Sequence, residues 1–306
     1  MSSIQYIRQK DINKKKWDEL VLNSQNGLIY TRSFFLDAMC QWDALVWGDY
    51  EYVMPLPFKK KGGFKYCYTP FFMGQLGISG KKEITETICK DFIEAIPTDF
   101  SLVDIHLNEF NNLPRDSGIK INKRVNYILP LHQEFDLIAA NFNKDARKNI
   151  RQAVSAGLYF TEDVEITDVF SFYKNAYGHL NKRITEQDYN KFYKVCQHAL
   201  NNNNGFTAGI KNAAGLLMAA AFFAIDNNRI YYLLGAPGSE GKKLNATHLL
   251  IHDVIKKYAG SRLVFDFEGS DIPSVASFYK KFGPVEKTYP HIGINRLPFW
   301  IKWLKK

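Results

Sequence analysis

Two carboxylates, Asp266 and Glu268, stand two residues apart near the end of a short segment that alternates in polarity. This alternation predicts a strand from 262 to 268, with the acids on one face and apolar residues on the other. The apolar residues are Leu263, Phe265 and Phe267. Because open sheets bind ligands at the carboxyl ends of their strands, the acids are either site residues or ordinary hydrated side chains.

A connection that carries glycine and lysine comes before that strand. It contains Gly238, Ser239, Gly241, Lys242 and Lys243, and it leads into a segment with the apolar spacing of a helix. The unpaired amides at a helix start bind phosphate, and the two lysines would strengthen such a site. The same composition is also typical of a solvated connection that binds nothing.

The elements predicted around these residues are a three-stranded antiparallel meander and a helical crossover to a fourth strand. Three apolar runs separated by turns rich in Asn and Asp predict two hairpins. The runs span 206–210, 215–225 and 229–234. The third strand is expected to leave the sheet at 235–238, where glycine and Pro237 interrupt the ladder. After a helix, the strand at Leu263 is expected to join the same sheet, and a short helix follows at 273–283.

A basic helix is predicted upstream of the meander, from Asn143 to Ala156, with Gly157 as its C-terminal stop. Its cations recur at three- and four-residue spacing, which places them on one side of the helix. They are Lys144, Arg147, Lys148 and Arg151. This basic stripe is either plain surface or a surface that faces an anion.

Composition limits the class of protein. A chain of 306 residues, 46% of them hydrophobic, is large enough for two domains with ordinary cores. No apolar run is long enough to span a bilayer, and the N-terminal residues lack the apolar core of a signal peptide, so we expect a cytoplasmic protein. The net charge of +9 favours an anionic partner. The cysteines and histidines are scattered, and we predict no metal site.

The first half predicts the same order of elements as the second. Two helices come first, with Asn13 as the cap of the first one. Strands and one helix follow, at 43–47, 50–58, 64–68, 82–96 (the helix) and 100–107. A hairpin turn is expected at 59–63 and a pair of short strands at 120–131. The shared order predicts an internal structural repeat with a boundary near residue 140.

Four motifs in the second half, together with the basic helix, resemble one family. The motifs are Tyr231-Tyr232-Leu233-Leu234-Gly235-Ala236, Asn245-Ala246-Thr247-His248-Leu249-Leu250, Asp266-Phe267-Glu268-Gly269-Ser270 and Phe278-Tyr279-Lys280-Lys281-Phe282-Gly283. In these residues the chain resembles the tandem GNAT-fold acyltransferases, the group of the Fem-type peptidyltransferases and the BioF2-like acetyltransferases. The resemblance spans residues 143–283.

The resemblance implies an α+β fold of two GNAT-like modules, each a mixed sheet flanked by helices. The modules would comprise residues 1–140 and 141–287, with a cleft between them. Residues 288–306 would dock back on the first module through Phe299, Trp300 and Trp303. The other interpretation of this aromatic and lysine-rich tail is peripheral membrane contact, for which so short a tail offers little area.

One position departs from the family pattern. Fem-type peptidyltransferases tend to have Lys directly after the first Phe of the last motif, where this chain has Tyr279, and Lys280 comes one place later. On a helix that shift is a rotation of roughly 100°. A peptidoglycan precursor therefore does not follow as the substrate.

The resemblance implies an N-acyltransferase that moves an acyl or aminoacyl group from acyl-CoA or aminoacyl-tRNA to an amine on a small molecule or peptide. Direct attack on the carbonyl, without a covalent intermediate, needs a base, oxyanion donors and a phosphate mount. Asp266 or Glu268 is expected as the proton acceptor and Tyr232 as acid or positioning hydroxyl. Asp266→Asn should then lower turnover with little loss of stability. The expected phosphate mount is Gly238, Ser239, Gly241, Lys242 and Lys243, and the expected substrate-binding residues are Arg147, Arg151, Tyr279 and Lys280.

The alternative is a non-catalytic protein of the same fold whose basic surface binds RNA, a nucleotide sugar or a glycan.

Overall fold

The computed structural model describes residues 3–114, 119–269 and 272–298. The chain folds into two compact units: unit 1 comprises residues 1–124 and 288–306, and unit 2 comprises residues 125–287. It leaves unit 1 within strand β7 (Lys120–Pro130) and returns within β13 (Val285–Asn295). The division precedes residue 140 because the second half of β7 pairs with a strand of unit 2. Phe299, Trp300 and Trp303 lie outside the described residues.

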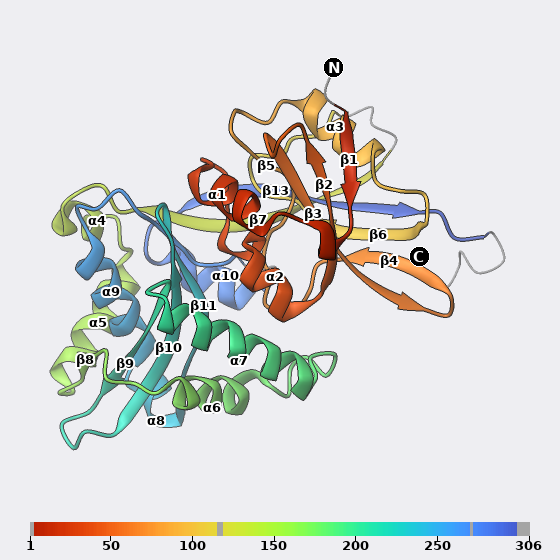
Figure 1. The fold of residues 1–306 in the computed structure, drawn as a ribbon. Coiled ribbons are helices and arrows are strands. Elements are labelled where there is room, and N and C mark those ends of the chain that lie inside the picture. Colours follow the sequence, from red (N-terminus) through yellow and green to blue (C-terminus); the bar gives the residue numbers. More distant parts are fainter. Residues whose placement is uncertain (1–2, 115–118, 270–271, 299–306) are drawn as a thin grey trace. The chain divides into compact units, whose positions relative to one another are not determined.

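Unit 1 is a mixed sheet with helices around it (Figure 1). Its strands are β1 (Ile4–Ile7), β2 (Gln41–Trp47), β3 (Tyr52–Lys61), β4 (Phe64–Tyr68), β5 (Ser79–Gly80) and β6 (Phe100–His106), and its helices are α1 (Lys14–Asn23), α2 (Ser33–Met39), α3 (Glu86–Glu94) and the 3₁₀ turns η1 (Gln9–Asp11) and η2 (Ile29–Thr31). The order is β1-β2-β3-β4-β6-β13, and β5 pairs with β3. The β4–β6 pair is parallel because α3 crosses between the two strands.

Local sequence explains these elements. Asn13 caps α1 by accepting the Lys16 N–H at 3.1 Å, as its position predicted. Strand β3 continues through Lys61, so the hairpin turn is shorter than 59–63. It consists of Gly62 and Gly63, which both take the positive φ that a tight turn requires.

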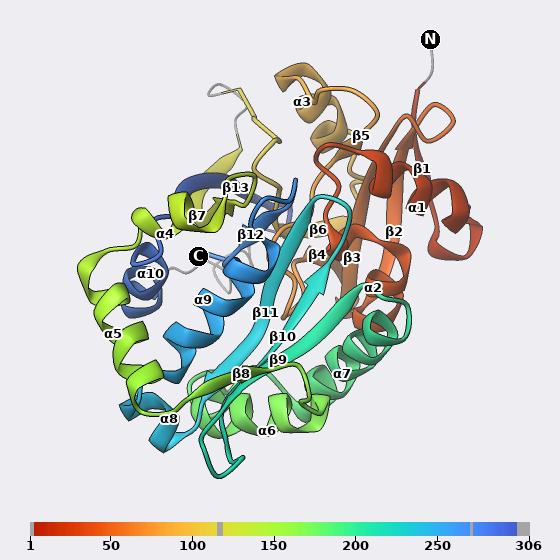
Figure 2. The same ribbon diagram turned by 90° about the vertical axis from the view of Figure 1, so that its left-hand side faces the viewer.

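Unit 2 is also a mixed sheet flanked by helices. Its helices are α4 (Phe135–Ala140), α5 (Lys144–Ser155), α6 (Ile166–Tyr177), α7 (Glu186–Asn201), α8 (Ser239–Lys243), α9 (Ala246–Tyr258) and α10 (Pro273–Lys280), and its strands are β8 (Tyr159–Thr161), β9 (Gly205–Lys211), β10 (Leu217–Ile225), β11 (Arg229–Pro237) and β12 (Val264–Asp266). With the second half of β7 the order is β7-β12-β11-β10-β9-β8. Helices α5 and α9 cover one face of β9–β11, and α6 and α7 cover the other (Figures 1 and 2).

The predicted meander and crossover are confirmed. Strands β9, β10 and β11 pair antiparallel in turn, and β12 joins β11 in parallel after α9. The last strand covers only Val264–Asp266 of the predicted 262–268, but the apolar residues pack as predicted: Phe265 and Phe267 are fully buried in the core of unit 2, and Leu263 packs against it.

Two strand predictions were wrong. Residues 120–130 form one strand of eleven residues rather than two short strands, because pairing with β12 carries the ladder through Leu129 to Pro130. Strand β11 does not leave the sheet at Gly235. It stays paired with β10 as far as Pro237, which lies opposite Ala219 at the strand end, where a missing amide donor costs little.

Candidate functional site

The parallel strands of unit 2 part at a defined point. Strand β12 pairs with β11 only as far as the Tyr231–Asp266 pair, whereas β11 continues to Pro237. In the described part of the chain, no strand pairs with the β12-side edge of β11 beyond Tyr231. Peptide groups on such an edge are available to an extended ligand. We call residues 232–237 the overhang of β11.

A bulge starts the overhang. On the β10 side, Phe223 lies opposite Tyr232 and Phe222 lies opposite Leu234, so Leu233 is an extra residue. A bulge bends its strand and increases the local twist. The bulge therefore accounts for the separation of β11 from β12 at this position.

Four tyrosines lie near one another at the start of the overhang, and we call Tyr173, Tyr177, Tyr232 and Tyr279 the tyrosine cluster. Tyr232 is 7% exposed, and its ring lies 6.4 Å from that of Tyr279 on α10, measured between centroids. Burial, with a smaller contribution from Tyr279 and from Tyr173 and Tyr177 on α6, raises the pKa of Tyr232 well above its usual value. Both Tyr232 and Tyr279 are thus protonated at neutral pH, so each hydroxyl has a proton to donate.

Gly235 makes room for the Tyr232 hydroxyl. A Cβ atom at Gly235 would lie 2.3 Å from Tyr232 Oη, which is closer than any side-chain carbon tolerates. The glycine in the overhang therefore lets the tyrosine ring lie along its own strand. This steric requirement, rather than an interruption of the strand, explains why glycine follows the tyrosine pair.

Asp266 is buried and surrounded by hydrogen-bond donors. It is 1% exposed, and its Oδ2 accepts hydrogen bonds from Arg229 Nη1 at 2.5 Å and Asn126 Nδ2 at 3.2 Å. Its Oδ1 accepts the backbone N–H of Glu268 at 2.8 Å. This carboxylate, buried and bound to Arg229 of β11 and Asn126 of β7, holds the end of β12 in place.

Glu268 differs from Asp266 in its exposure and in its backbone conformation. It is partly exposed, and its backbone has the positive φ of +66°, which is uncommon outside glycine. Gly269 follows with φ +54°, and a Cβ there would lie 2.2 Å from Val125 O. The Glu268 carboxylate is, after burial, the next largest cause of the raised pKa of Tyr279. The turn thus directs a carboxylate toward the tyrosine cluster.

The two candidate residues on helix α10, Tyr279 and Lys280, point in different directions. Tyr279 is turned inward, with its ring 5.1 Å from Phe267. Lys280 is exposed, and its Nζ lies 3.2 Å from Glu286, which together with Tyr127 raises the pKa of the lysine. It also borders a hollow of about 410 Å³ between the starts of α5 and α10, lined by Asn143, Asp145, Pro273, Ala276, Ser277, Lys280 and Lys281. The structure therefore does not bring Lys280 together with Tyr232.

The predicted phosphate mount is a helix of only five residues, α8. The Gly238 N–H donates to Met218 O at 2.9 Å, and a Cβ at Gly241 would lie 1.8 Å from the same oxygen. Both contacts fix α8 on β10, so Gly241 has a packing role. Lys243 pairs with Glu240 at 2.7 Å, whereas Lys242 has no acidic partner in the described residues.

The basic stripe lies on the exposed side of α5. Lys144, Arg147, Lys148 and Arg151 are all exposed, while Ala146, Ile150 and Ala153 face the core. Arg147 Nη1 donates to Ala140 O at 3.3 Å. The predicted cap is present, since Asn143 accepts the Ala146 N–H, and Gly157 ends the helix with φ +73°. The stripe is thus accessible to a ligand.

Sequence reasoning missed α6 and α7, and with α6 it missed Tyr173 and Tyr177. The signals were present. Thr185 and Asp188 form a capping box at the start of α7, and Val169 and Phe170 are among the buried residues on one side of α6.

Two kinds of feature are absent from the described residues. They contain no group of three or more His, Cys, Asp or Glu side chains arranged to hold a metal ion. None of their helices is long and apolar enough to cross a membrane.

Comparison with known proteins gives matches in structure and none in sequence. No protein-family model and no curated protein matches the chain. The crystal structure of FemX matches with a TM-score of 0.69 and 13% identity, over 94% of this chain and 97% of FemX. The structure of L-PGS from Bacillus licheniformis matches with a TM-score of 0.56 and 14% identity, over 95% of this chain and 94% of L-PGS.

A tandem GNAT protein from the clavulanic acid biosynthesis pathway matches with a TM-score of 0.51 and 11% identity, over 97% of this chain and 99% of that protein. At these identities the likeness establishes the fold. The chain has the tandem GNAT fold, and the resemblance seen in its motifs is confirmed at that level.

Proposed function

We propose that this protein is an N-acyltransferase and that the activated carbonyl of its donor binds in unit 2, beside the overhang of β11. The observation that carries the proposal is the parting of β11 from β12 next to the tyrosine cluster. An extended donor with amide groups would continue the ladder that β12 leaves at Asp266, in the manner of an added strand. The FemX, L-PGS and tandem GNAT likenesses support this choice of reaction class.

The reaction needs one proton acceptor and one proton donor. The amine nitrogen attacks the carbonyl carbon, a C–N bond forms, and the bond to the departing sulfur or oxygen breaks. Glu268 accepts the proton that the amine loses, and Tyr232 donates a proton to the leaving atom. Exchange with solvent then restores both side chains, so the protein is unchanged after each turnover.

Of the two carboxylates predicted from the sequence, we assign Glu268 as the proton acceptor. Asp266 is fully buried and bound to Arg229 and Asn126, whereas Glu268 is partly exposed and acts electrostatically on Tyr279. Burial keeps the Tyr232 hydroxyl protonated at neutral pH by raising its pKa, so the hydroxyl is available to hydrogen-bond the leaving atom and to pass it a proton as the negative charge develops there.

The donor carries phosphates in either of two chemical classes. In an acyl-CoA they would contact Lys242 and the amides at the start of α8. In an aminoacyl-tRNA they would contact the basic stripe on α5, whose four cations are exposed. Acyl-CoA and aminoacyl-tRNA remain the two candidate donors, and an amine on a small molecule or peptide is the acceptor.

The test is a transfer assay read by mass spectrometry, with acyl-CoAs and aminoacyl-tRNAs as donors and a panel of amines as acceptors. We expect Glu268→Gln and Tyr232→Phe each to lower turnover by about 100-fold. Matched controls are Glu94→Gln in unit 1 and Tyr159→Phe, since both side chains are largely exposed and remote from the overhang in sequence.

Wild-type turnover in both site variants would contradict the assignment of the residues. If no donor is consumed and none raises the melting temperature, the protein is the non-catalytic alternative. A ligand at 100 times its dissociation constant stabilises by about 2.7 kcal/mol, so specific binding would be detected.

A further inference from the structure

A second hollow lies in unit 1, and none of the residues assigned to acyl transfer lines it. It has a volume of about 690 Å³, within the range of pockets that hold small ligands. Four cationic side chains and one carboxylate line it. The lining residues are Arg8, Gln9, Lys10, Lys14, Gln41, Asp43, Phe58 and Lys60.

Most of the positive charge in the hollow is not neutralised by the protein. Lys14 is ion-paired with Asp37 at 2.6 Å. Arg8, Lys10 and Lys60 are exposed and have no acidic partner within the described part of the chain. Three unpaired cations around one concave surface attract an anion and hold it with charge-assisted hydrogen bonds.

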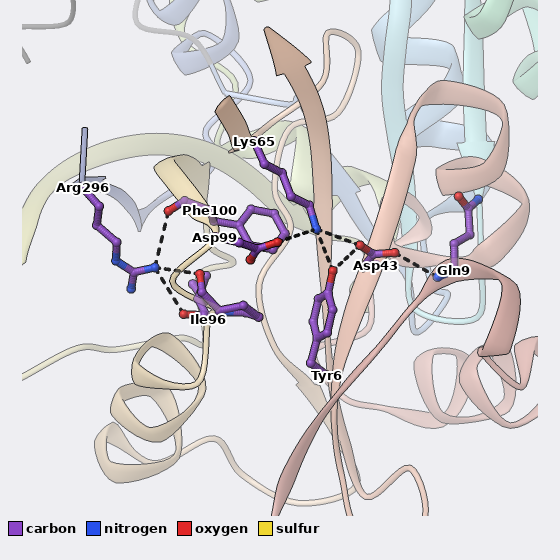
Figure 3. A network of polar contacts seen from close by, with 9 residues as sticks. Tyr6, Gln9, Asp43, Lys65, Ile96, Asp99, Phe100 and Arg296 are labelled. Carbon is purple, nitrogen blue, oxygen red and sulfur yellow. Dashed lines mark hydrogen bonds and ion pairs between the residues drawn. The ribbon is translucent and has the colours of Figure 1, made fainter. Parts of the chain in front are cut away.

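The single carboxylate of the hollow is already neutralised. Asp43 is 7% exposed and lies 3.1 Å from Lys65 Nζ, and it also accepts hydrogen bonds from the Tyr6 hydroxyl and the Gln9 backbone N–H (Figure 3). Lys65 is itself held between the rings of Phe58 and Phe100, at 4.3 and 4.0 Å from their centroids. The floor of the hollow is therefore rigid and does not repel an anion.

Strand geometry selects the cations that reach the hollow. Phe58 and Lys60 lie two residues apart on β3 and share one face, so both line the hollow. Lys59 and Lys61 point to the opposite face, and Lys59 Nζ lies 4.6 Å above the ring of Tyr68. Only one lysine of the Lys59–Lys61 run therefore contributes to the hollow.

We propose that this hollow of unit 1 binds the phosphate of a small phosphorylated molecule of nucleotide size. Arg8, Lys10 and Lys60 contact the phosphate. The side chain of Gln41 is exposed and makes no hydrogen bond to other described residues, and its amide contacts the polar body of the ligand. The site does not depend on the acyltransferase proposal, since none of its residues belongs to unit 2.

The experiment is calorimetric titration of the full chain at low salt with inorganic pyrophosphate and with adenosine monophosphate. We expect both to bind, and we expect Lys60→Ala and Arg8→Ala each to weaken binding by about tenfold. Lys61→Ala removes the same charge from the same hairpin on the opposite face, and it should weaken binding by less than about twofold. Melting temperatures confirm that each variant is folded.

Two results would overturn the proposal. One is equal weakening by Lys60→Ala and Lys61→Ala, which would show that only net charge matters. The other is no binding of either probe, including the case in which the chain binds RNA or anionic vesicles instead. Lys242→Ala serves as the cross-check. It should leave pyrophosphate binding to this hollow unchanged, and it should weaken the binding of an acyl-CoA donor. Failure of the two proposals can thus be distinguished.

Discussion

The two units repeat one arrangement of strands but end it differently. In each, an antiparallel pair leads through a helix to a parallel strand: β3, β4, α3 and β6 in unit 1, and β10, β11, α9 and β12 in unit 2. In unit 1 the last parallel pair joins Tyr68 to Asp104, and Tyr68 is also the end of β4. In unit 2 the corresponding strand continues from Tyr231 to Pro237. Of these two parallel pairs, the one in unit 2 therefore leaves an overhang and the one in unit 1 does not.

The position of the register shift in each unit explains this difference. In unit 1 the shift of register falls inside the parallel pair, between Lys65 and Tyr66, where Ser101 of β6 is the extra residue. In unit 2 the bulge falls after the parallel pair, at Leu233. An irregularity within a pair is absorbed by local packing, whereas one beyond the pair turns the strand away and exposes its edge. The same topology thus leaves an unpaired strand edge in unit 2 and none at the corresponding strand end of unit 1.

The largest expected effect is the loss of the buried ion pair between Arg229 and Asp266 in unit 2. Asp266→Ala leaves Arg229 buried without its carboxylate and should destabilise unit 2 by about 3–5 kcal/mol in chemical unfolding. The control is Asp163→Ala, which removes an ion pair with Lys211 whose aspartate is 91% exposed and should cost less than about 1 kcal/mol. A stable Asp266→Asn variant with low turnover would instead restore Asp266 as the base.

The pH dependence of stability compares one histidine from each unit. Burial lowers the pKa of His106 in unit 1 and of His248 in unit 2 to about 4, from an ordinary value of 6.5. The unfolded chain therefore binds protons that the folded chain excludes. Stability should be constant above about pH 6.5 and fall between pH 6.5 and 4, by at most about 1.4 kcal/mol per pH unit for each histidine.

The measurement is the free energy of unfolding across that pH range in the wild type and in His106→Gln and His248→Gln. Each variant should show a shallower decline. An unchanged slope in either variant would mean that its histidine does not contribute to the loss.

A smaller effect is expected for the packing of α8. Gly241→Ala forces a Cβ against Met218 O and should destabilise the chain by about 1–3 kcal/mol, as overpacked sites do. Gly293→Ala is the control, because nothing lies within 4 Å of a Cβ there and its φ is ordinary, so the change should stay within about 0.5 kcal/mol. Equal changes in the free energy of unfolding in the two variants would mean that α8 shifts away from Met218 without cost and that Gly241 has no packing role.

Periodicity predicted most of the fold and little of the site. The meander, the crossover and the caps at Asn13 and Asn143 follow from local patterns, because turns, caps and alternating faces depend on neighbouring residues. The overhang was not predicted. Gly235 and Pro237 suggested a break, and only the pairing of β11 with β10 shows that the strand continues.

The choice between the two acids was equally beyond the sequence. Their alternation placed both on one strand face, but the partner of Asp266 is Arg229, 37 residues earlier in the chain. Likewise, the high pKa of Tyr232 arises from burial and from tyrosines on α6 and α10, which no spacing within β11 reveals. Site chemistry in this protein is set by contacts between distant segments.

The most direct test of the central claim is hydrogen–deuterium exchange of the backbone amides, with and without donor. Each candidate donor, acyl-CoA or aminoacyl-tRNA, is added at saturation, and exchange is compared between residues 232–237 and the equivalent strand end of unit 1, Phe64–Tyr68. If the overhang of β11 binds the donor, at least one donor slows exchange at 232–237 and leaves 64–68 unchanged. Protection by a bound donor that spares residues 232–237 would contradict the claim that acyl transfer takes place there.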